Sequence, residues 1–237
     1  MSRSALRLLG ARVAPPCRTL CAAALHPHSR DAHAADEPHA PPPPPPPPPR
    51  RPDLSPLAHG SSARRAAIDR MLRVDHAGET GAVHIYAGQL SVLGGTGDAA
   101  TLEEMGSHER AHLARFNELL PRHRTRPSAL LPLWRAAGYA LGAGSAALGR
   151  EAAYAVTEAV ESAITEHYDA QLRELHSLGG DGEEEELRGV FRSFRDEEQA
   201  HLDEAVRQDA HLAPAYGLIK AAVKAGCGAA IWLTHRV

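Results

Sequence analysis

Apolar positions recur with helical spacing from about residue 62 to the end of the chain, and no stretch shows the alternation of a convincing β-strand. Glycine pairs, prolines and polar residues interrupt this pattern and divide it into six stretches. The expected helices are Ser62 to Leu93, Asp98 to about Pro121, Ser128 to about Gly149, Arg150 to Leu178, Asp181 onward, and about Pro214 to near the end. The pattern therefore predicts an all-α protein.

The first two helices repeat as the fourth and fifth. Each pair is expected to form half of an up-down-up-down bundle, and the third helix crosses between the halves. Asp98 is the expected cap of the second helix, and Asp181 with Glu184 resembles a capping box at the start of the fifth. The expected fold is a ferritin-like four-helix bundle with two extra apolar helices.

The two extra helices hold few charges. Residues 130–149 contain only Arg135, and residues 215–233 contain only Lys220 and Lys224. Both stretches are too short or too charged to span a bilayer comfortably, yet more apolar than ordinary surface helices. Either they lie in the membrane interface, or they are buried in the bundle or an oligomer contact. In the first case the residues near the lipid headgroups are Trp134, Trp232 and the two lysines.

Residues 1–58 lack the helical pattern and are expected to be a leader and a spacer. Residues 1–30 contain five arginines and no acidic residue, as in a mitochondrial transit peptide, and they lack the sustained apolar core of a secretory signal. Nine consecutive prolines, Pro41 to Pro49, favour an extended polyproline spacer over a ligand for SH3-type domains. Residues 59–237 then form one domain, which is long enough to bury a core.

Charge and cysteine content remove several function classes. The formal net charge of −3 implies no strong attraction for nucleic acid. Once the expected leader is removed, Cys227 is the only cysteine, which excludes an internal disulfide and a cysteine-bound zinc or iron–sulfur site. A single thiol fits a reducing compartment such as the mitochondrial matrix.

Two Glu-x-x-His pairs carry the candidate chemistry, and each follows a single helical glutamate. Glu and His at positions i and i+3 share a helix face and can bind one ion, while a second helix adds a carboxylate that can bridge to a neighbouring ion. This order is the pattern by which four-helix bundles hold two iron or manganese ions. The residues are Glu79, then Glu109 with His112, and Glu161, then Glu198 with His201.

The context of these pairs matters more than their number, because composition alone gives roughly one such pair by chance. Each single glutamate lies in a mostly apolar helix, where an unpaired carboxylate would be costly to bury. Each is also followed seven residues later by a tyrosine on the same face, Tyr86 after Glu79 and Tyr168 after Glu161. We interpret Glu79, Glu161 and Tyr168 as catalytic residues; the alternative is a set of solvated glutamates and ordinary histidines.

The chain resembles the mitochondrial demethoxyubiquinone hydroxylases, the di-iron monooxygenases of ubiquinone biosynthesis. The resemblance runs from about Ile68 to Val237 and is carried by VDHAGETGAVHIYAGQ, SHERAHLARFNELL, RPSALLPLWRAAGYALGAGSAALG, RDEEQAHLDEA and LAPAYGLIKAAVKAGC. It implies that two iron ions are held by Glu79, Glu109, His112, Glu161, Glu198 and His201. It also implies that one atom of O2 enters the quinone ring, that the other leaves as water, and that NADH supplies the electrons.

The same resemblance implies a polyprenyl quinone substrate and a peripheral position on the matrix face of the mitochondrial inner membrane. It further implies a lipid-binding partner protein and other members of the biosynthetic complex, and a homo-oligomer is compatible with it. Around the ligands, Glu197 and Asp196 are expected to hold the outer nitrogen of a ligand histidine. Glu158 is expected to lie outside the ligand set, and His76 and His167 either support the ligands or pack.

Other proteins use the same six ligands for iron storage, peroxide reduction, manganese catalase activity or quinol oxidation. An iron store predicts a soluble cage with polar outer helices, unlike residues 130–149 and 215–233. A rubrerythrin-like peroxidase usually adds a cysteine-bound iron domain. A quinol oxidase is the nearest rival enzyme, and a scaffold role in the biosynthetic complex is the main role without chemistry.

Overall fold

The computed structural model describes residues 62–179 and 183–237, in which there are six α-helices and no strand. The helices are α1 (Ser62–Leu93), α2 (Ala99–Arg122), α3 (Leu131–Ala147), α4 (Arg150–Ser177), α5 (Glu183–Arg207) and α6 (Tyr216–Thr234), with a 3₁₀ turn, η2 (Ala210–Leu212), before α6. The all-α fold is confirmed. The predicted leader and spacer, residues 1–58, lie outside the described residues and stay a prediction.

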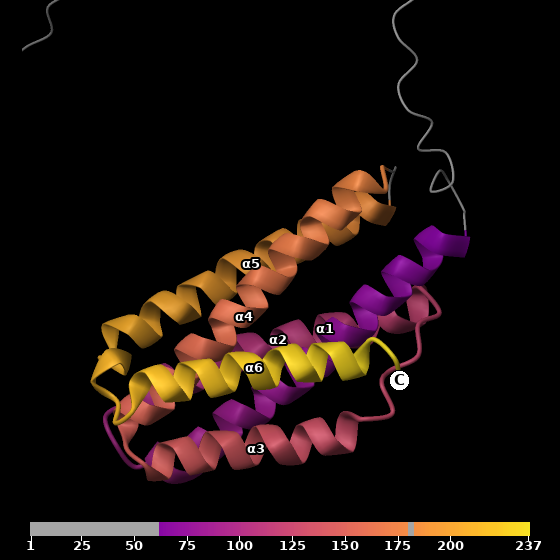
Figure 1. Ribbon diagram of the computed structural model, residues 1–237. Coiled ribbons are helices and arrows are strands. Elements are labelled where there is room, and N and C mark those ends of the chain that lie inside the picture. Colours follow the sequence, from indigo (N-terminus) through magenta and orange to yellow (C-terminus); the bar gives the residue numbers. More distant parts are fainter. Residues whose placement is uncertain (1–61, 180–182) are drawn as a thin grey trace, which may run out of the picture. The chain divides into compact units, whose positions relative to one another are not determined.

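Helices α1, α2, α4 and α5 form the bundle (Figure 1). Two polar contacts between α1 and α4 show that these helices run in opposite directions. Near one end Gln171 donates to Asp75 at 2.7 Å, and near the other Gln89 donates to the carbonyl oxygen of Ala153 at 3.1 Å. The short connections of α1 to α2 and of α4 to α5 make the neighbours within each half antiparallel as well. The bundle order is therefore up-down-down-up, with α2 and α4 parallel, and the predicted up-down-up-down order is wrong because α3 runs back along the bundle between the two halves.

Two predicted helix starts differ in detail. Asp98 precedes α2 but makes no capping hydrogen bond, because its backbone is already helical (φ −79°, ψ −15°) and its carboxylate accepts from Arg150 at 3.0 Å. Ser128 does not open α3, which begins at Leu131; its hydroxyl accepts the backbone N–H of Leu130 at 3.1 Å. Asp181 lies outside the described residues, so the predicted capping box is not tested.

Helix α3 packs against α1 at unusually close range because glycines face the contact. A Cβ on Gly142 would lie 2.0 Å from the carbonyl oxygen of Ile85, and one on Gly138 would lie 2.5 Å from that of Gly81. Any side chain at these two positions would therefore push the helices apart. Since both pairs advance together along the chain, α3 runs parallel to α1.

Helix α6 is attached to α4 by polar groups and leaves most of its surface exposed. Glu158 of α4 is buried and accepts from Tyr216 at 2.8 Å and from Lys220 at 2.6 Å. Further along, Lys224 donates to Glu166 at 2.8 Å. Thr234 is the one buried residue of α6, so burial within the bundle is wrong for this helix. Among the described residues, α6 alone has the length and composition to cross a membrane, a test that some helices of soluble proteins also pass.

Candidate metal centre

All six predicted ligands lie together in the middle of the bundle. Helix α1 contributes Glu79 and α4 contributes Glu161, and the two Glu-x-x-His pairs come from α2 and α5. Each of the six residues is at most 3% exposed. The helical period aligns each Glu with its His on the inner face, as the sequence predicts. The six residues are Glu79, Glu109, His112, Glu161, Glu198 and His201.

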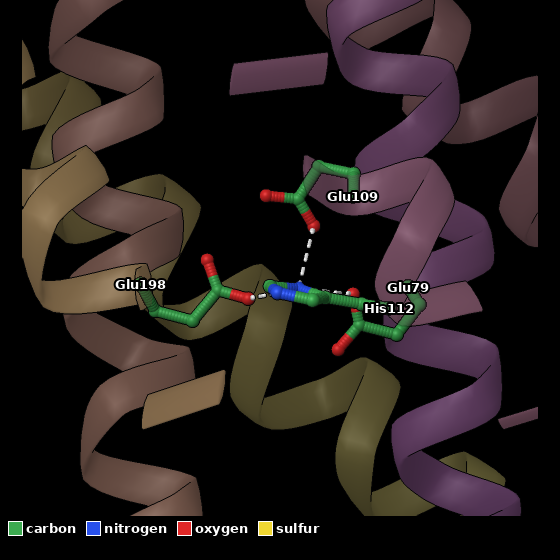
Figure 2. A group of neighbouring side chains, drawn as sticks. All are labelled: Glu79, Glu109, His112 and Glu198. Carbon is green, nitrogen blue, oxygen red and sulfur yellow. Dashed lines mark ion pairs between the residues drawn. The ribbon is translucent and has the colours of Figure 1, made fainter. Parts of the chain in front are cut away.

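The ligand atoms form two groups of four, and within each group they lie within 4.8 Å of one another. Figure 2 shows the first group, in which three carboxylates surround the ring of His112; its members are Glu79, Glu109, His112 and Glu198. The second group is Glu109, Glu161, Glu198 and His201. The shared members are the glutamates of the Glu-x-x-His pairs. Glu109 and Glu198 are therefore the carboxylates common to both groups, and a bridging role for the single glutamates stays a prediction.

The cluster carries buried polar atoms that are left without a hydrogen bond in the described part of the chain. They are Oε2 of Glu79, Oε1 of Glu109 and Nδ1 of His112. Nδ1 of His112 lies 3.2 Å from Glu198 and 3.6 Å from Glu79. Oε1 of Glu109 lies 3.0 Å from Nδ1 of His201, so these atoms contact other members of the cluster. Carboxylate oxygens and imidazole nitrogens that converge in this way out of contact with water fit a cation, since carboxylate and imidazole together suit iron or manganese.

Electrostatics in the cluster lead to the same conclusion. Burial raises the pKa of Glu79, and burial together with the neighbouring Glu198 carboxylate raises the pKa values of Glu109 and Glu161 well above their usual range. Although burial opposes it, contact with both histidines holds the pKa of Glu198 at about 2. Burial also opposes ionisation of His112, but Glu198 and Glu79 raise its pKa to about 12. Protons therefore neutralise part of the cluster, and bound cations would take their place.

The outer nitrogen of each ligand histidine is held by a residue of the opposite half. Nε2 of His112 lies 3.0 Å from Glu197, as predicted for this carboxylate. Nε2 of His201 lies 3.1 Å from Nδ1 of His108, and the two rings are stacked. His108 was not predicted, although its place just before Glu109 matches that of Glu197 just before Glu198.

The two tyrosines also cross between the halves. Tyr86 of α1 donates to Glu161 of α4 at 2.8 Å, and Tyr168 of α4 donates to Glu79 of α1 at 2.6 Å. Each tyrosine follows one single glutamate by two helical turns and binds the other. The two hydroxyls therefore orient Glu161 and Glu79, each of which belongs to only one of the two four-residue groups.

The remaining candidates lie outside both groups. Asp196 is exposed and pairs with its neighbour Arg195, so its predicted contact with a ligand histidine is wrong. His76 contacts Asn117 at 3.1 Å and acts as a packing residue. His167 lies 3.3 Å from buried Asp75, beside Tyr168. Glu158 binds α6, as described above.

An apolar cavity of about 450 Å³ reaches the cluster from the side covered by α3 and α6. Four of the six candidate ligands form its polar end: Glu79, Glu109, Glu161 and Glu198. The rest of its wall is almost entirely small or aliphatic, with residues of α1, α3, α4 and α6. A cavity of this kind suits a small aromatic or aliphatic molecule that must be brought next to the cluster.

Comparison with known proteins gives consistent matches. The family described as ubiquinone biosynthesis protein COQ7 matches residues 66–234. A Mus musculus protein, NADPH-dependent 3-demethoxyubiquinone 3-hydroxylase, mitochondrial, is 53% identical over 173 residues, which cover 73% of this chain and 79% of the relative. The 3-demethoxyubiquinol 3-hydroxylase of Rhodospirillum rubrum is 46% identical over 179 residues (75% and 82%). The 5-demethoxyubiquinone hydroxylase, mitochondrial, of Saccharomyces cerevisiae is 40% identical over 200 residues (79% and 86%).

Proposed function

The chain belongs to the ubiquinone biosynthesis protein COQ7 family, and on this premise we propose that it is a di-iron monooxygenase that hydroxylates the ring of demethoxyubiquinone. Membership makes the protein an enzyme, an oxidoreductase of the hydroxylase class. The observation that carries the proposal is the apolar cavity that ends on the buried carboxylate and histidine cluster. Its volume supports a quinone ring bound beside the residues that are proposed to hold two metal ions.

In the proposed reaction a ring C–H bond becomes C–O–H, the second oxygen atom of O2 leaves as water, and two electrons and two protons are consumed. Two irons in the two four-residue groups would supply the activation of O2. The chain itself binds the ring in the cavity, excludes water with aliphatic walls, and fixes the ligand carboxylates through Tyr86 and Tyr168. A reduced nicotinamide nucleotide is the proposed electron donor; the mouse relative is named NADPH-dependent, whereas the sequence resemblance led us to expect NADH.

The test is turnover of purified, iron-loaded protein with a short-tailed demethoxyubiquinone, ¹⁸O₂ and either NADPH or NADH. We expect one ¹⁸O atom in the quinone product by mass spectrometry, and about two irons per chain by metal analysis. Glu198→Ala should abolish the product, while the exposed-site control Glu166→Gln should not. Label found only in water would support the rival quinol oxidase and contradict the proposal.

The proposed location is the mitochondrion, which the names of the mouse and yeast relatives support for those proteins. Within it we propose a peripheral position on the matrix face of the inner membrane. Support comes from large apolar side chains left exposed on α3 and α6, the same helices that line the cavity: Leu133, Tyr139, Leu218, Trp232 and Leu233. Trp134 and the two lysines do not fit the predicted headgroup role, because Trp134 lines the cavity and the lysines pair with α4.

Membrane attachment can be tested by liposome flotation. Burial of apolar surface in the interface contributes about 25 cal/mol per Å², so an added charge on the exposed face should weaken binding. Leu133→Asp and Leu218→Asp are suitable because 51% and 69% of these residues are exposed. Unchanged flotation would instead favour an oligomer contact. A lipid-binding partner protein of the pathway would be sought by co-purification with the same variants.

A further inference from the structure

One polar group in the cavity wall has no role in the metal cluster. Trp134 of α3 lines the cavity, and its indole Nε1 is buried without a hydrogen-bond partner among the described residues. An indole N–H is a donor only, and a buried donor that has lost water without gaining an acceptor is unfavourable. Such a group is rare in a folded protein and calls for an explanation, of which an absent ligand is one.

The register of α3 against α1 places this donor near the cluster. Gly138 packs directly on Gly81, and one helical turn earlier on each helix stand Trp134 and Ala77. Trp134, Ala77, Gly78 and the candidate ligand Glu79 all line the same cavity. The Trp134 position on α3 therefore lies within about one helical turn of Glu79 along the bundle, and its side chain lines the cavity that the candidate ligands close at one end.

The cavity wall has few other hydrogen-bond donors for the oxygen atoms of a ligand. Besides the four carboxylates, which accept rather than donate when ionised, its polar side chains are those of Trp134, Cys227 and Thr234. A thiol is a weak donor, and burial raises the pKa of Cys227 to about 11, so it remains a neutral thiol. The Trp134 indole N–H and the Thr234 hydroxyl are thus the two donors of this wall besides the thiol, and the indole N–H is the one that cannot also act as an acceptor.

We propose that the Trp134 indole N–H donates a hydrogen bond to a ring oxygen of the quinone substrate and so fixes the orientation of the ring toward the metal cluster. This inference rests on the proposed function, because it presupposes that a quinone ring enters the cavity. It makes Trp134 a substrate-binding residue that distinguishes oxygenated rings from plain aromatic ones. The same bond explains why a tryptophan, and not a phenylalanine, is suited to this wall.

The test compares two ligands that share one short alkyl tail, a demethoxyubiquinone and an alkylbenzene without ring oxygens. Their dissociation constants are measured by calorimetry on wild type, Trp134→Phe and Leu141→Ala, another wall residue of α3. Trp134→Phe should weaken quinone binding by about three- to ten-fold, the contribution of one neutral hydrogen bond, and leave the alkylbenzene unchanged. Leu141→Ala should weaken both ligands alike.

A second measurement keeps Trp134 in place. The chain has two tryptophans, so Trp232→Phe leaves Trp134 as the only one, and ultraviolet resonance Raman then reports whether its N–H is hydrogen-bonded. The N–H band should shift with the quinone and not with the alkylbenzene. Equal losses for both ligands in Trp134→Phe, or a band that the quinone does not move, would overturn this inference and leave the hydroxylase proposal standing. A wild type that fails to bind the quinone at all would overturn both.

Discussion

The candidate metal centre consists of two similar sites, one around His112 and one around His201. They differ in the residue that contacts the outer ring nitrogen of the histidine. In both, a Glu-x-x-His pair on one helix faces a single glutamate whose carboxylate is held by a tyrosine from the other half. In each Glu-x-x-His pair, the residue just before the glutamate contacts the histidine of the other pair. For His112 this residue is Glu197, with a carboxylate, whereas for His201 it is His108, with an imidazole ring.

This difference has a chemical consequence. A carboxylate that accepts the outer N–H of a ligand imidazole fixes its tautomer and makes the inner nitrogen a stronger donor to a metal. An imidazole partner also contacts the outer nitrogen but adds no negative charge. We therefore expect the metal position at His112 to be the tighter of the two, although the ligands themselves are equivalent.

The largest effect should come from the residues that the halves share. Glu198 belongs to both four-residue groups, while Glu161 belongs to one. Glu198→Ala should leave fewer than one iron per chain, and Glu161→Ala should leave about one, at the His112 position. Metal analysis after reconstitution checks both, with circular dichroism as the control for folding. Equal loss in the two variants would show that the positions do not load independently.

Features of this centre that depend on spacing within one helix could be predicted from the sequence, whereas contacts between helices could not. The clustering of the six candidate ligands could be predicted because i, i+3 spacing on one helix and an apolar setting need no knowledge of packing. Glu197 could be proposed from its position beside Glu198. His108 occupies the matching position before Glu109 and could have been proposed in the same way. That either residue reaches a histidine of the other pair could not be predicted, because both contacts depend on the register of α2 against α5.

The fold shows the same limit. Helix boundaries followed from glycine and proline signals, and α1 has the predicted bounds Ser62–Leu93. The capping role of Asp98 failed because Arg150, distant in sequence, attracts its carboxylate. The cavity and the buried Trp134 N–H arise where α3 and α6 pack on the bundle, and a pattern of apolar residues does not define such a space.

Removing the carboxylate from the His112 half should have the next largest effect. Glu197→Gln retains a side chain that can accept the His112 N–H but removes the negative charge. We expect metal affinity at the tighter position to fall by about 10- to 100-fold, as is usual for the outer partner of a ligand histidine. Competition titration against a coloured chelator measures this. Asp196→Asn is the matched control, because this neighbouring carboxylate is exposed and pairs with Arg195; a similar loss there would point to general charge and not to the contact.

A carboxylate beside the outer nitrogen of both histidines should reduce the difference in metal affinity between the two positions. His108→Glu places a carboxylate acceptor for the N–H of His201 where the imidazole ring now stands, so affinity at the weaker position should rise by up to about tenfold. Two resolved steps in the metal titration should then approach one. His108→Gln is the control, since it offers an uncharged acceptor and should leave the steps apart. Steps that stay separate in both variants would mean that the inequality of the halves has another source.

The smallest effect is expected where the halves are alike, at the two tyrosines. Tyr86→Phe and Tyr168→Phe each remove one buried hydrogen bond to a carboxyl group, which contributes about 1 kcal/mol to the free energy of unfolding. In a domain of this size each change should lower the Tm of the metal-free protein by about 2–4 °C. Because the hydroxyls bind different glutamates, the double variant should show nearly the sum of the two shifts. Calorimetry can decide this: a large shift for one tyrosine and none for the other would mean that the halves differ in their carboxylate supports as well as in the outer contacts of His112 and His201.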